Sequence, residues 1–257
     1  MTSETPPPTE WDRWVAMESC ANFRDAGGYP AAGGRAVRTG VLYRSGSPSR
    51  MTERDVALAQ DELGIRTVID LRAQAEAQEA GPAPFTETCG VEIVGVPLGR
   101  GPKGSTDGLP DLTTGRGLGP LYIFHAQQEP QRIAEAVSLV GARCSDPLVV
   151  HCAGGKDRTG MVIALVLDVL GVDQETIIED YALTELNLAG IPEANLAALT
   201  RQLGEHGWPE AILHAVPESM RAFLEWLRTE HRSAEAFLKS HGAGSETVDA
   251  LRSNLLA

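Results

Sequence analysis

Residues 147–160, which read PLVVHCAGGKDRTG, decide the fold that we expect for this chain. The apolar run before the cysteine predicts a short buried strand, and the apolar run Met161–Leu170 predicts a helix that is buried on nearly all sides. Between them lies a polar turn with Gly154 and Gly155, which permit unusual backbone angles and a close approach to a ligand. A strand that leads through such a loop into a helix builds an anion site, because the unpaired N–H groups and the dipole of the first helical turn face the loop.

Two residues of this loop, Cys152 and Arg158, point to phosphoryl transfer. A thiolate is a good nucleophile, and a helix N-terminus, successive loop N–H groups and an arginine all favour the thiolate over the thiol. Arg158 can bind two phosphate oxygens with its planar guanidinium group, which a lysine cannot do. Attack of Cys152 on phosphorus would give a phosphocysteine that water then hydrolyses, and Thr159 can donate its hydroxyl to the departing sulfur.

The order His-Cys-x-x-Gly-x-x-Arg-Thr-Gly resembles the signature of the cysteine-dependent protein tyrosine and dual-specificity phosphatases. The central Gly-Lys-Asp-Arg is similar to a bacterial group of tyrosine or multi-specificity phosphatases whose loop reads HCxxGKDRTG. That group also carries an NFRDLGGY-type motif, and residues 22–29 of this chain read NFRDAGGY. Leu42–Gly46 and Thr67–Arg72 are similar to that group as well. The resemblance spans the chain from about Asn22 to the C-terminus and implies an α/β fold with a central, mostly parallel sheet flanked by helices.

The resemblance also implies which residues bind the phosphate: Ala153, Gly154, Gly155, Lys156, Asp157 and Arg158 of the loop. The lysine is similar to the loop lysine of phosphoinositide phosphatases and can contact a second phosphate. Arg24 and Asp25 on pattern alone favour surface ion pairs, whereas the resemblance implies a place in the substrate pocket. We expect His151 to orient the loop by hydrogen bonds and not to act as a base.

The proton donor for the leaving group has several candidates. Cleavage of a phosphate ester with a poor leaving group needs such a donor. Asp157 lies in the loop itself. Asp70 ends a predicted central strand, where open α/β sheets place ligands, although it can equally cap the segment that follows. Asp107 and Asp111 lie in the glycine- and proline-rich stretch Gly99–Pro120, a long loop of the kind that is usually functional or disordered. We favour Asp157 or Asp70 over the other two.

The rest of the chain alternates between strand and helix patterns and then becomes helical in its C-terminal third. A proline-rich tail over residues 1–10 is expected to be disordered, and residues 11–257 are expected to form a single phosphatase domain. We expect strands near Val41–Arg44, Arg66–Leu71 and Gly90–Leu98, and helices near Ser47–Leu63, Ala73–Ala80, Pro120–His125, Pro130–Arg143 and Asp173–Leu188, with further helix starts at Pro192, Pro217, Ser233 and Ser245.

Composition excludes several classes of function. The formal net charge of −13 argues against a general nucleic-acid or anionic-membrane surface, so an anionic substrate needs a local cationic pocket. The four cysteines, Cys20, Cys89, Cys144 and Cys152, show no metal-ligand spacing, and nothing indicates a cofactor. A reactive free thiol needs a reducing compartment, which predicts the cytoplasm. No apolar run reaches membrane-spanning length, and the first ten residues lack a signal-peptide core.

Three functions remain open from the sequence. The first is a phosphatase acting on phosphotyrosine or phosphoserine proteins or on phosphoinositides. The second has the same chemistry but acts on a small phosphorylated metabolite. The third is a catalytically silent phosphate-binding module, which the intact Cys152, Arg158 and Thr159 disfavour, because such a module does not need a nucleophile.

Overall fold

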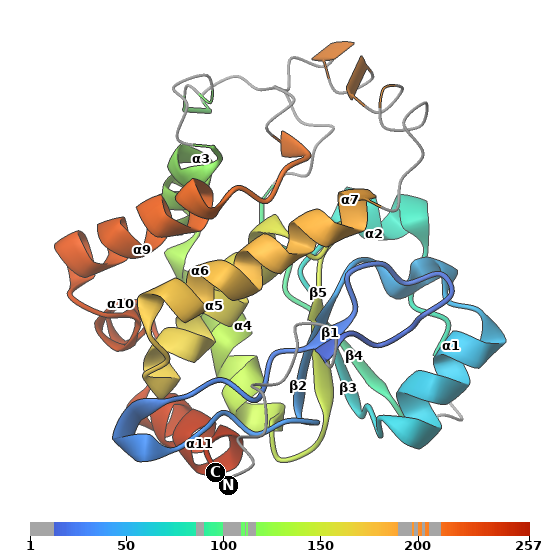
Figure 1. Ribbon diagram of the computed structural model, residues 1–257, viewed down its shortest axis with the longest axis horizontal. Coiled ribbons are helices and arrows are strands. Elements are labelled where there is room, and N and C mark those ends of the chain that lie inside the picture. The colour runs from blue at the N-terminus through green and yellow to red at the C-terminus, as the bar shows by residue number, and fades with distance from the viewer. Residues whose placement is uncertain are drawn as a thin grey trace, which may run out of the picture.

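The computed structural model describes residues 13–85, 90–99, 109–110, 112, 117–189, 197, 200–201, 204–205 and 212–257. Within these residues, five strands form one sheet in the order β1-β2-β5-β3-β4 (Figure 1). The strands are β1 (Arg24–Asp25), β2 (Leu42–Ser45), β3 (Thr67–Asp70), β4 (Glu92–Gly95) and β5 (Leu148–His151). Only β1 runs antiparallel to its neighbour, so the prediction of a mostly parallel α/β sheet is confirmed.

The central strand β5 carries the chain into the loop that contains the cysteine. His151, its last residue, pairs with Ser45 of β2 on one side and with Asp70 of β3 on the other. The carboxyl ends of three parallel strands are therefore level at one edge of the sheet. This edge is where open α/β sheets bind ligands.

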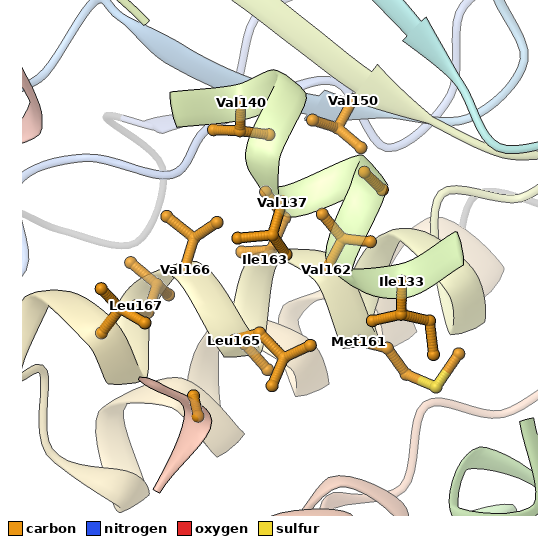
Figure 2. Close-up of a cluster of buried hydrophobic side chains, with 14 of the residues drawn as sticks. Ile133, Val137, Val140, Val150, Met161, Val162, Ile163, Leu165, Val166 and Leu167 are labelled. Carbon is orange, nitrogen blue, oxygen red and sulfur yellow. The ribbon is translucent and has the colours of Figure 1, made fainter. Parts of the chain in front are cut away.

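Alternate residues of the strands enter two separate cores. Leu148 and Val150 pack into the larger core, whereas Val149 between them packs into the smaller core on the opposite face. Figure 2 shows the larger core, in which Val137 of helix α4 (Pro130–Arg143) lies beside Val162 and Ile163 of helix α5 (Asp157–Leu170). The predicted burial of the helix that follows the loop is confirmed, because all residues from Thr159 to Leu167 are buried.

The two faces of the sheet are covered unequally. Helices of the C-terminal half gather with α4 and α5 on the face of the larger core, while α1 lies on the other face (Figure 1). The remaining α-helices with described bounds are α1 (Glu53–Ala57), α2 (Gln74–Ala80), α3 (Gly119–Gln128), α6 (Gln174–Ala182), α7 (Leu186–Ala189), α9 (Pro217–His231), α10 (Ala234–Ser240) and α11 (Ser245–Leu255). The described part of the C-terminal third is helical, as predicted.

Some boundaries differ from the sequence-based expectation, and the helix expected over Asp173–Leu188 is divided into α6, a 3₁₀ turn at Leu183–Glu185 and α7. The single helix expected over Ser47–Leu63 is split into a 3₁₀ turn at Pro48–Arg50, the short helix α1 and a π-helical turn at Leu58–Glu62. The predicted start at Thr52 is confirmed as a capping box with Asp55. Helix α5 begins at Asp157, four residues before the apolar run, because the polar residues after the loop already adopt helical geometry.

Several predicted features lie outside the described residues. These are the tail over residues 1–10, the helix start at Pro192, Cys89, Asp107 and Asp111. Among the described residues, no helix combines the length and the apolar character needed to span a membrane.

Candidate active site

The loop Cys152–Arg158, called the phosphate loop below, is held by its carbonyl oxygens. Three successive carbonyl groups accept hydrogen bonds from outside the loop, so each of them faces away from its centre. The donors are Ser47 N to Ala153 O at 2.8 Å, Asn22 Nδ2 to Gly154 O at 3.1 Å and to Gly155 O at 3.0 Å, and Arg44 NH2 to Gly155 O at 2.8 Å.

The orientation of these carbonyl groups fixes the direction of the loop N–H groups. In a trans peptide the C=O and the following N–H point to opposite sides, and all described peptide bonds are trans. The N–H groups of Gly154, Gly155 and Lys156 therefore face the inside of the loop. The first-turn N–H groups of α5 add to them, since Asp157 and Arg158 open that helix. The result is a nest of donors suited to a tetrahedral oxyanion.

The two loop glycines have different roles. Gly155 has a φ of 68°, and a Cβ atom built on it would lie 2.4 Å from the backbone carbon and oxygen of Ser45. Only glycine fits there, because the loop packs directly on the end of β2. Gly154 has no positive φ, and apart from its chain neighbours no described residue lies within 4 Å of the Cβ position built on it. The backbone therefore requires glycine at position 155 and shows no such requirement at position 154, where approach of a ligand stays a prediction.

Cys152 follows the last residue of β5 and is 2% exposed. The hydroxyl oxygen of Thr159 is fully buried and has no hydrogen-bond partner among the residues that the structure describes. A buried, unpaired hydroxyl is rare and calls for an explanation. A donor held ready for the sulfur or for a bound phosphate oxygen is such an explanation, and it agrees with the role predicted for Thr159.

His151, before the cysteine, contacts the backbone through one ring nitrogen. Its Nδ1 lies 3.1 Å from the carbonyl oxygen of Cys152. Burial lowers the pKa of His151 to about 4, so the ring is neutral at neutral pH. This geometry agrees with an orienting role.

Arg158 forms an end-on ion pair with Glu76, a residue that its place in the sequence did not indicate. Its NH1 and NH2 groups bind both oxygens of Glu76 in α2, with 2.9 Å between NH2 and Oε1. Glu76 also accepts the backbone N–H of Ala73 at 2.8 Å, which fixes the carboxylate itself. Burial opposes the charge of Arg158, but the pair with Glu76 outweighs burial and raises the pKa of Arg158 above its ordinary value. The arginine is therefore a fixed cation with its Nε edge outside this pair.

Asp157 lies at the first position of α5 and is about one third exposed, with 33% of its side-chain area accessible. Its Oδ1 accepts the hydroxyl of Tyr122 at 2.6 Å and lies 3.5 Å from Nζ of Lys156. The carboxylate thus belongs to the phosphate loop and is partly exposed.

Asp70, the other favoured candidate for the acid, forms an ion pair with Arg72. It accepts the backbone N–H of Arg72 at 2.9 Å, which is the capping role considered from the sequence, and binds the Arg72 guanidinium at 2.6 Å. His151 Nε2 lies 3.6 Å away. Burial would raise the pKa of Asp70, but the hydrogen bonds from Arg72 and the nearby His151 more than compensate and hold the pKa below its usual value. An ionised, paired carboxylate is a poor proton donor.

Lys156 points toward the C-terminal half of the chain. Its buried ammonium group donates to the carbonyl oxygens of Ile212 and His214, at 3.1 Å for the latter. In this structure the lysine joins the phosphate loop to that segment and does not face an open pocket.

Arg24 and Asp25 have hydrogen-bond partners within the protein. The Arg24 side chain is fully buried and donates to Asp180, to Asn22 Oδ1 and to Thr184 Oγ1. The Asp25 carboxylate accepts the N–H groups of Gly27 and Gly40 at 2.7 and 2.6 Å, which closes a turn. The polar groups of both residues are used inside the protein, and the substrate-binding role that the resemblance implies for them stays a prediction.

The centre of this buried network is Asp180 in α6, which sequence reasoning missed. It contacts Arg24 Nε at 3.4 Å, Arg44 NH1 at 2.5 Å and the Tyr29 hydroxyl at 3.0 Å. Arg44 in turn donates to Gly155 O. The NFRD motif and the strand β2 therefore hold the phosphate loop through the hydrogen bonds of Asn22 and Arg44 to the carbonyl oxygen of Gly155.

No group of three or more histidine, cysteine, aspartate or glutamate side chains within the described ranges is arranged to hold a metal ion.

A cysteine directly after a parallel strand, a nest of N–H groups and an arginine at the start of the following helix define a cysteine-dependent phosphatase of the tyrosine phosphatase type. The model of the tyrosine phosphatase family matches residues 15–257, and this chain belongs to that family. It is accordingly an enzyme that hydrolyses phosphate monoesters, and the resemblance noted in its sequence is confirmed.

Named relatives agree with this assignment. A protein of Cupriavidus necator, provisionally named a tyrosine-protein phosphatase, is 31% identical over 239 residues, covering 91% of this chain and 81% of the relative. The triple specificity protein phosphatase PtpB of Mycobacterium tuberculosis is 25% identical over 272 residues, covering 91% and 96%. The solved catalytic domain of the yeast phosphatase Siw14, from S. cerevisiae, is 13% identical and covers 70% of this chain and 93% of that domain; its TM-score of 0.37 supports no further argument.

Proposed function

We propose that this phosphatase acts through a phosphocysteine on Cys152, with Asp157 as the proton donor and phosphoproteins as its main substrates. The observation that carries the proposal is the phosphate loop, whose outward carbonyl groups turn its N–H groups toward one point beside Cys152 and Arg158. Fixed donors of this kind stabilise the charge that develops on a transferring phosphoryl group.

In the first step the sulfur of Cys152 attacks phosphorus. The S–P bond forms as the bond between phosphorus and the leaving oxygen breaks. That oxygen keeps the electron pair and takes a proton from Asp157. Asp157 suits this role better than Asp70, because it is partly exposed beside the loop, whereas Asp70 is bound by Arg72.

In the second step water replaces the sulfur. The Asp157 carboxylate takes a proton from the water, a new O–P bond forms, and the S–P bond breaks with its electron pair left on Cys152. The unpaired hydroxyl of Thr159 donates to the departing sulfur. Inorganic phosphate leaves, and both residues return to their starting protonation states.

Phosphotyrosine or phosphoserine proteins are the substrates that we favour, with phosphoinositides next. The printed names of the relatives in Cupriavidus and Mycobacterium support protein substrates. Lys156 donates to two carbonyl oxygens, so contact with a second phosphate of a phosphoinositide would first require it to leave them.

The proposed compartment follows from the chemistry of the thiol. Cys20, Cys144 and Cys152 are free thiols. Since the mechanism needs a reduced Cys152, we place the protein in a reducing compartment such as the cytoplasm. One family model matching residues 15–257 also supports a single phosphatase domain.

The test is phosphate release from a panel of phosphotyrosine and phosphoserine peptides, phosphoinositides, and sugar and nucleoside phosphates, with Cys152→Ser as the matched control. We expect release from the peptides, no release by the variant, and unchanged binding of inorganic phosphate to the variant. Release from one small phosphate alone would replace the protein substrates with a metabolite. Turnover by Cys152→Ser would contradict the covalent mechanism, and binding without turnover by the wild type would indicate a silent module.

A further inference from the structure

A buried pair of tyrosine hydroxyls lies behind Asp157. The hydroxyl of Tyr122 in α3 is 2.6 Å from Asp157 Oδ1 and 2.6 Å from the hydroxyl of Tyr181 in α6. Both tyrosines are almost completely buried, at 0% and 1% exposure, and their rings meet edge to face. Residues of three helices that are distant in sequence are therefore joined through the Tyr122 hydroxyl.

The direction of these hydrogen bonds follows from the number of protons. The hydroxyl of Tyr122 donates to Asp157 Oδ1, and a phenol has a single O–H proton to donate. Tyr122 therefore accepts from Tyr181. Burial, together with the negative charge of Asp157, raises the pKa of both tyrosines, so both keep their protons at neutral pH.

The contacts of Asp157 are unevenly divided between its two oxygens. Tyr122 and the more distant Lys156 both contact Oδ1, and among the described residues no side chain donates to Oδ2. A donor on Oδ1 is compatible with both the ionised carboxylate and the acid protonated on Oδ2. Oδ2 is therefore the oxygen that is available to carry a proton.

We propose that Tyr122, supported by Tyr181, is a positioning residue that holds Asp157 with Oδ2 toward the leaving group. This inference rests on the proposed function, because it assumes that Asp157 is the proton donor. Neither tyrosine touches the reacting atoms. The pair fixes the rotamer of a side chain that is otherwise exposed enough to turn into solvent, and proton transfer depends on such positioning.

The test compares two substrates of nearly equal size whose leaving groups differ in basicity, phenyl phosphate and para-nitrophenyl phosphate. Only the more basic phenolate needs a proton as it leaves. For Tyr122→Phe we expect kcat/KM for phenyl phosphate, which reports the transfer to Cys152, to fall about tenfold, a part of the roughly 10²–10⁴-fold that a general acid contributes. The value of kcat/KM for para-nitrophenyl phosphate should change little. Tyr181→Phe should give a smaller contrast in the same direction, and it replaces the first variant should that one not fold.

Tyr29→Phe is the matched control. Tyr29 is also buried and also donates to a buried carboxylate, that of Asp180, at 3.0 Å. Its loss should affect both substrates by the same factor. Equal slowing of the two substrates by Tyr122→Phe and by Tyr181→Phe would overturn the positioning role.

Asp157→Asn separates this inference from the proposed function. If that variant shows the leaving-group contrast and the tyrosine variants do not, the positioning role is wrong while the acid assignment holds. If Asp157→Asn itself shows no contrast, Asp157 is not the acid, and the assignment on which the inference rests fails.

Discussion

At the scale of single residues, Asp180 resolves an electrostatic problem beneath the phosphate loop. Arg24 and Arg44 are both fully buried and close to each other. Two buried cations without a counter-charge would be strongly unfavourable. Burial would raise the pKa of Asp180, but the charges of Arg44 and Arg24 outweigh burial and hold the pKa below its usual value. The carboxylate is therefore ionised and shared by both arginines.

Replacing Asp180 by Asn should destabilise the protein strongly. Removal of one partner of a buried ion pair leaves an uncompensated charge and costs roughly 3–5 kcal/mol. Urea unfolding at pH 7 measures this loss. A lowered carboxylate pKa stabilises the fold above the unfolded value, near 4, and this stabilisation disappears as the pH falls through the folded pKa. Wild type should therefore lose stability below about pH 4, and the variant should lack that part of the loss.

Glu175→Gln provides the comparison for this prediction. Glu175 pairs with Arg221 on the surface, where both side chains are exposed. Water screens exposed pairs, so this change should leave the unfolding midpoint nearly unchanged. An Asp180→Asn protein as stable as the Glu175→Gln protein would show that the buried network does not support the fold.

The residues that could be predicted from the sequence are those that lie within one short segment. Cys152, Arg158 and Thr159 belong to a single loop, so their spacing alone indicated an anion site and a nucleophile. Their partners could not be predicted in this way, since Glu76 is 82 residues from Arg158, and Tyr122 is 35 residues from Asp157. Such pairs form only when the fold brings distant segments together.

At the scale of elements, the phosphate loop is shaped by the strand beside it. Gly155 sits against the backbone of Ser45 at the end of β2, while the adjacent Gly154 is exposed. The sequence indicated a tight turn with two glycines but not which one carries the positive φ. That distinction depends on the packing of the loop against β2, which is 110 residues earlier in the chain.

Gly155→Ala and Gly154→Ala form a matched pair of variants for this account. In Gly155→Ala the left-handed backbone costs about 1–2 kcal/mol, and the clash with Ser45 adds to that. In Gly154→Ala the new methyl group enters open space, so the free energy of unfolding should change by no more than about 0.5 kcal/mol. Urea unfolding of both proteins distinguishes them. Equal stability of the two variants would mean that the loop does not pack on β2 as described.

Element boundaries were predictable where local chemistry sets them. Thr52 and Asp55 form the expected capping box, and Pro217 opens α9 as expected. The change from α-helix to π-helix after α1 could not be predicted from the sequence. The apolar pattern of a helix continues through Leu58–Glu62, and this stretch contains no proline or glycine. The end of the segment does carry a local signal, because Gly64 follows it with a φ of 67°.

At the scale of the whole molecule, the sheet concentrates cationic groups in an acidic protein. The chain has a formal net charge of −13, yet Arg158 and Lys156 lie in one loop and Arg24 and Arg44 lie beneath it. The level carboxyl ends of β2, β5 and β3 bring these residues together. The sequence predicted a mostly parallel sheet and an anionic ligand. It could not predict the strand order or the unequal cover of the two faces, which depend on contacts between distant segments.

The central claim is that Cys152 carries the phosphoryl group during turnover. The most direct measurement is acid quenching of the enzyme during turnover of para-nitrophenyl phosphate, followed by mass spectrometry of its peptides. The account predicts the added mass of one phosphoryl group on the peptide with Cys152, appearing before steady state and absent in Cys152→Ser. Full turnover by the wild type with the phosphoryl group on another residue, or continued turnover by Cys152→Ser, would contradict it.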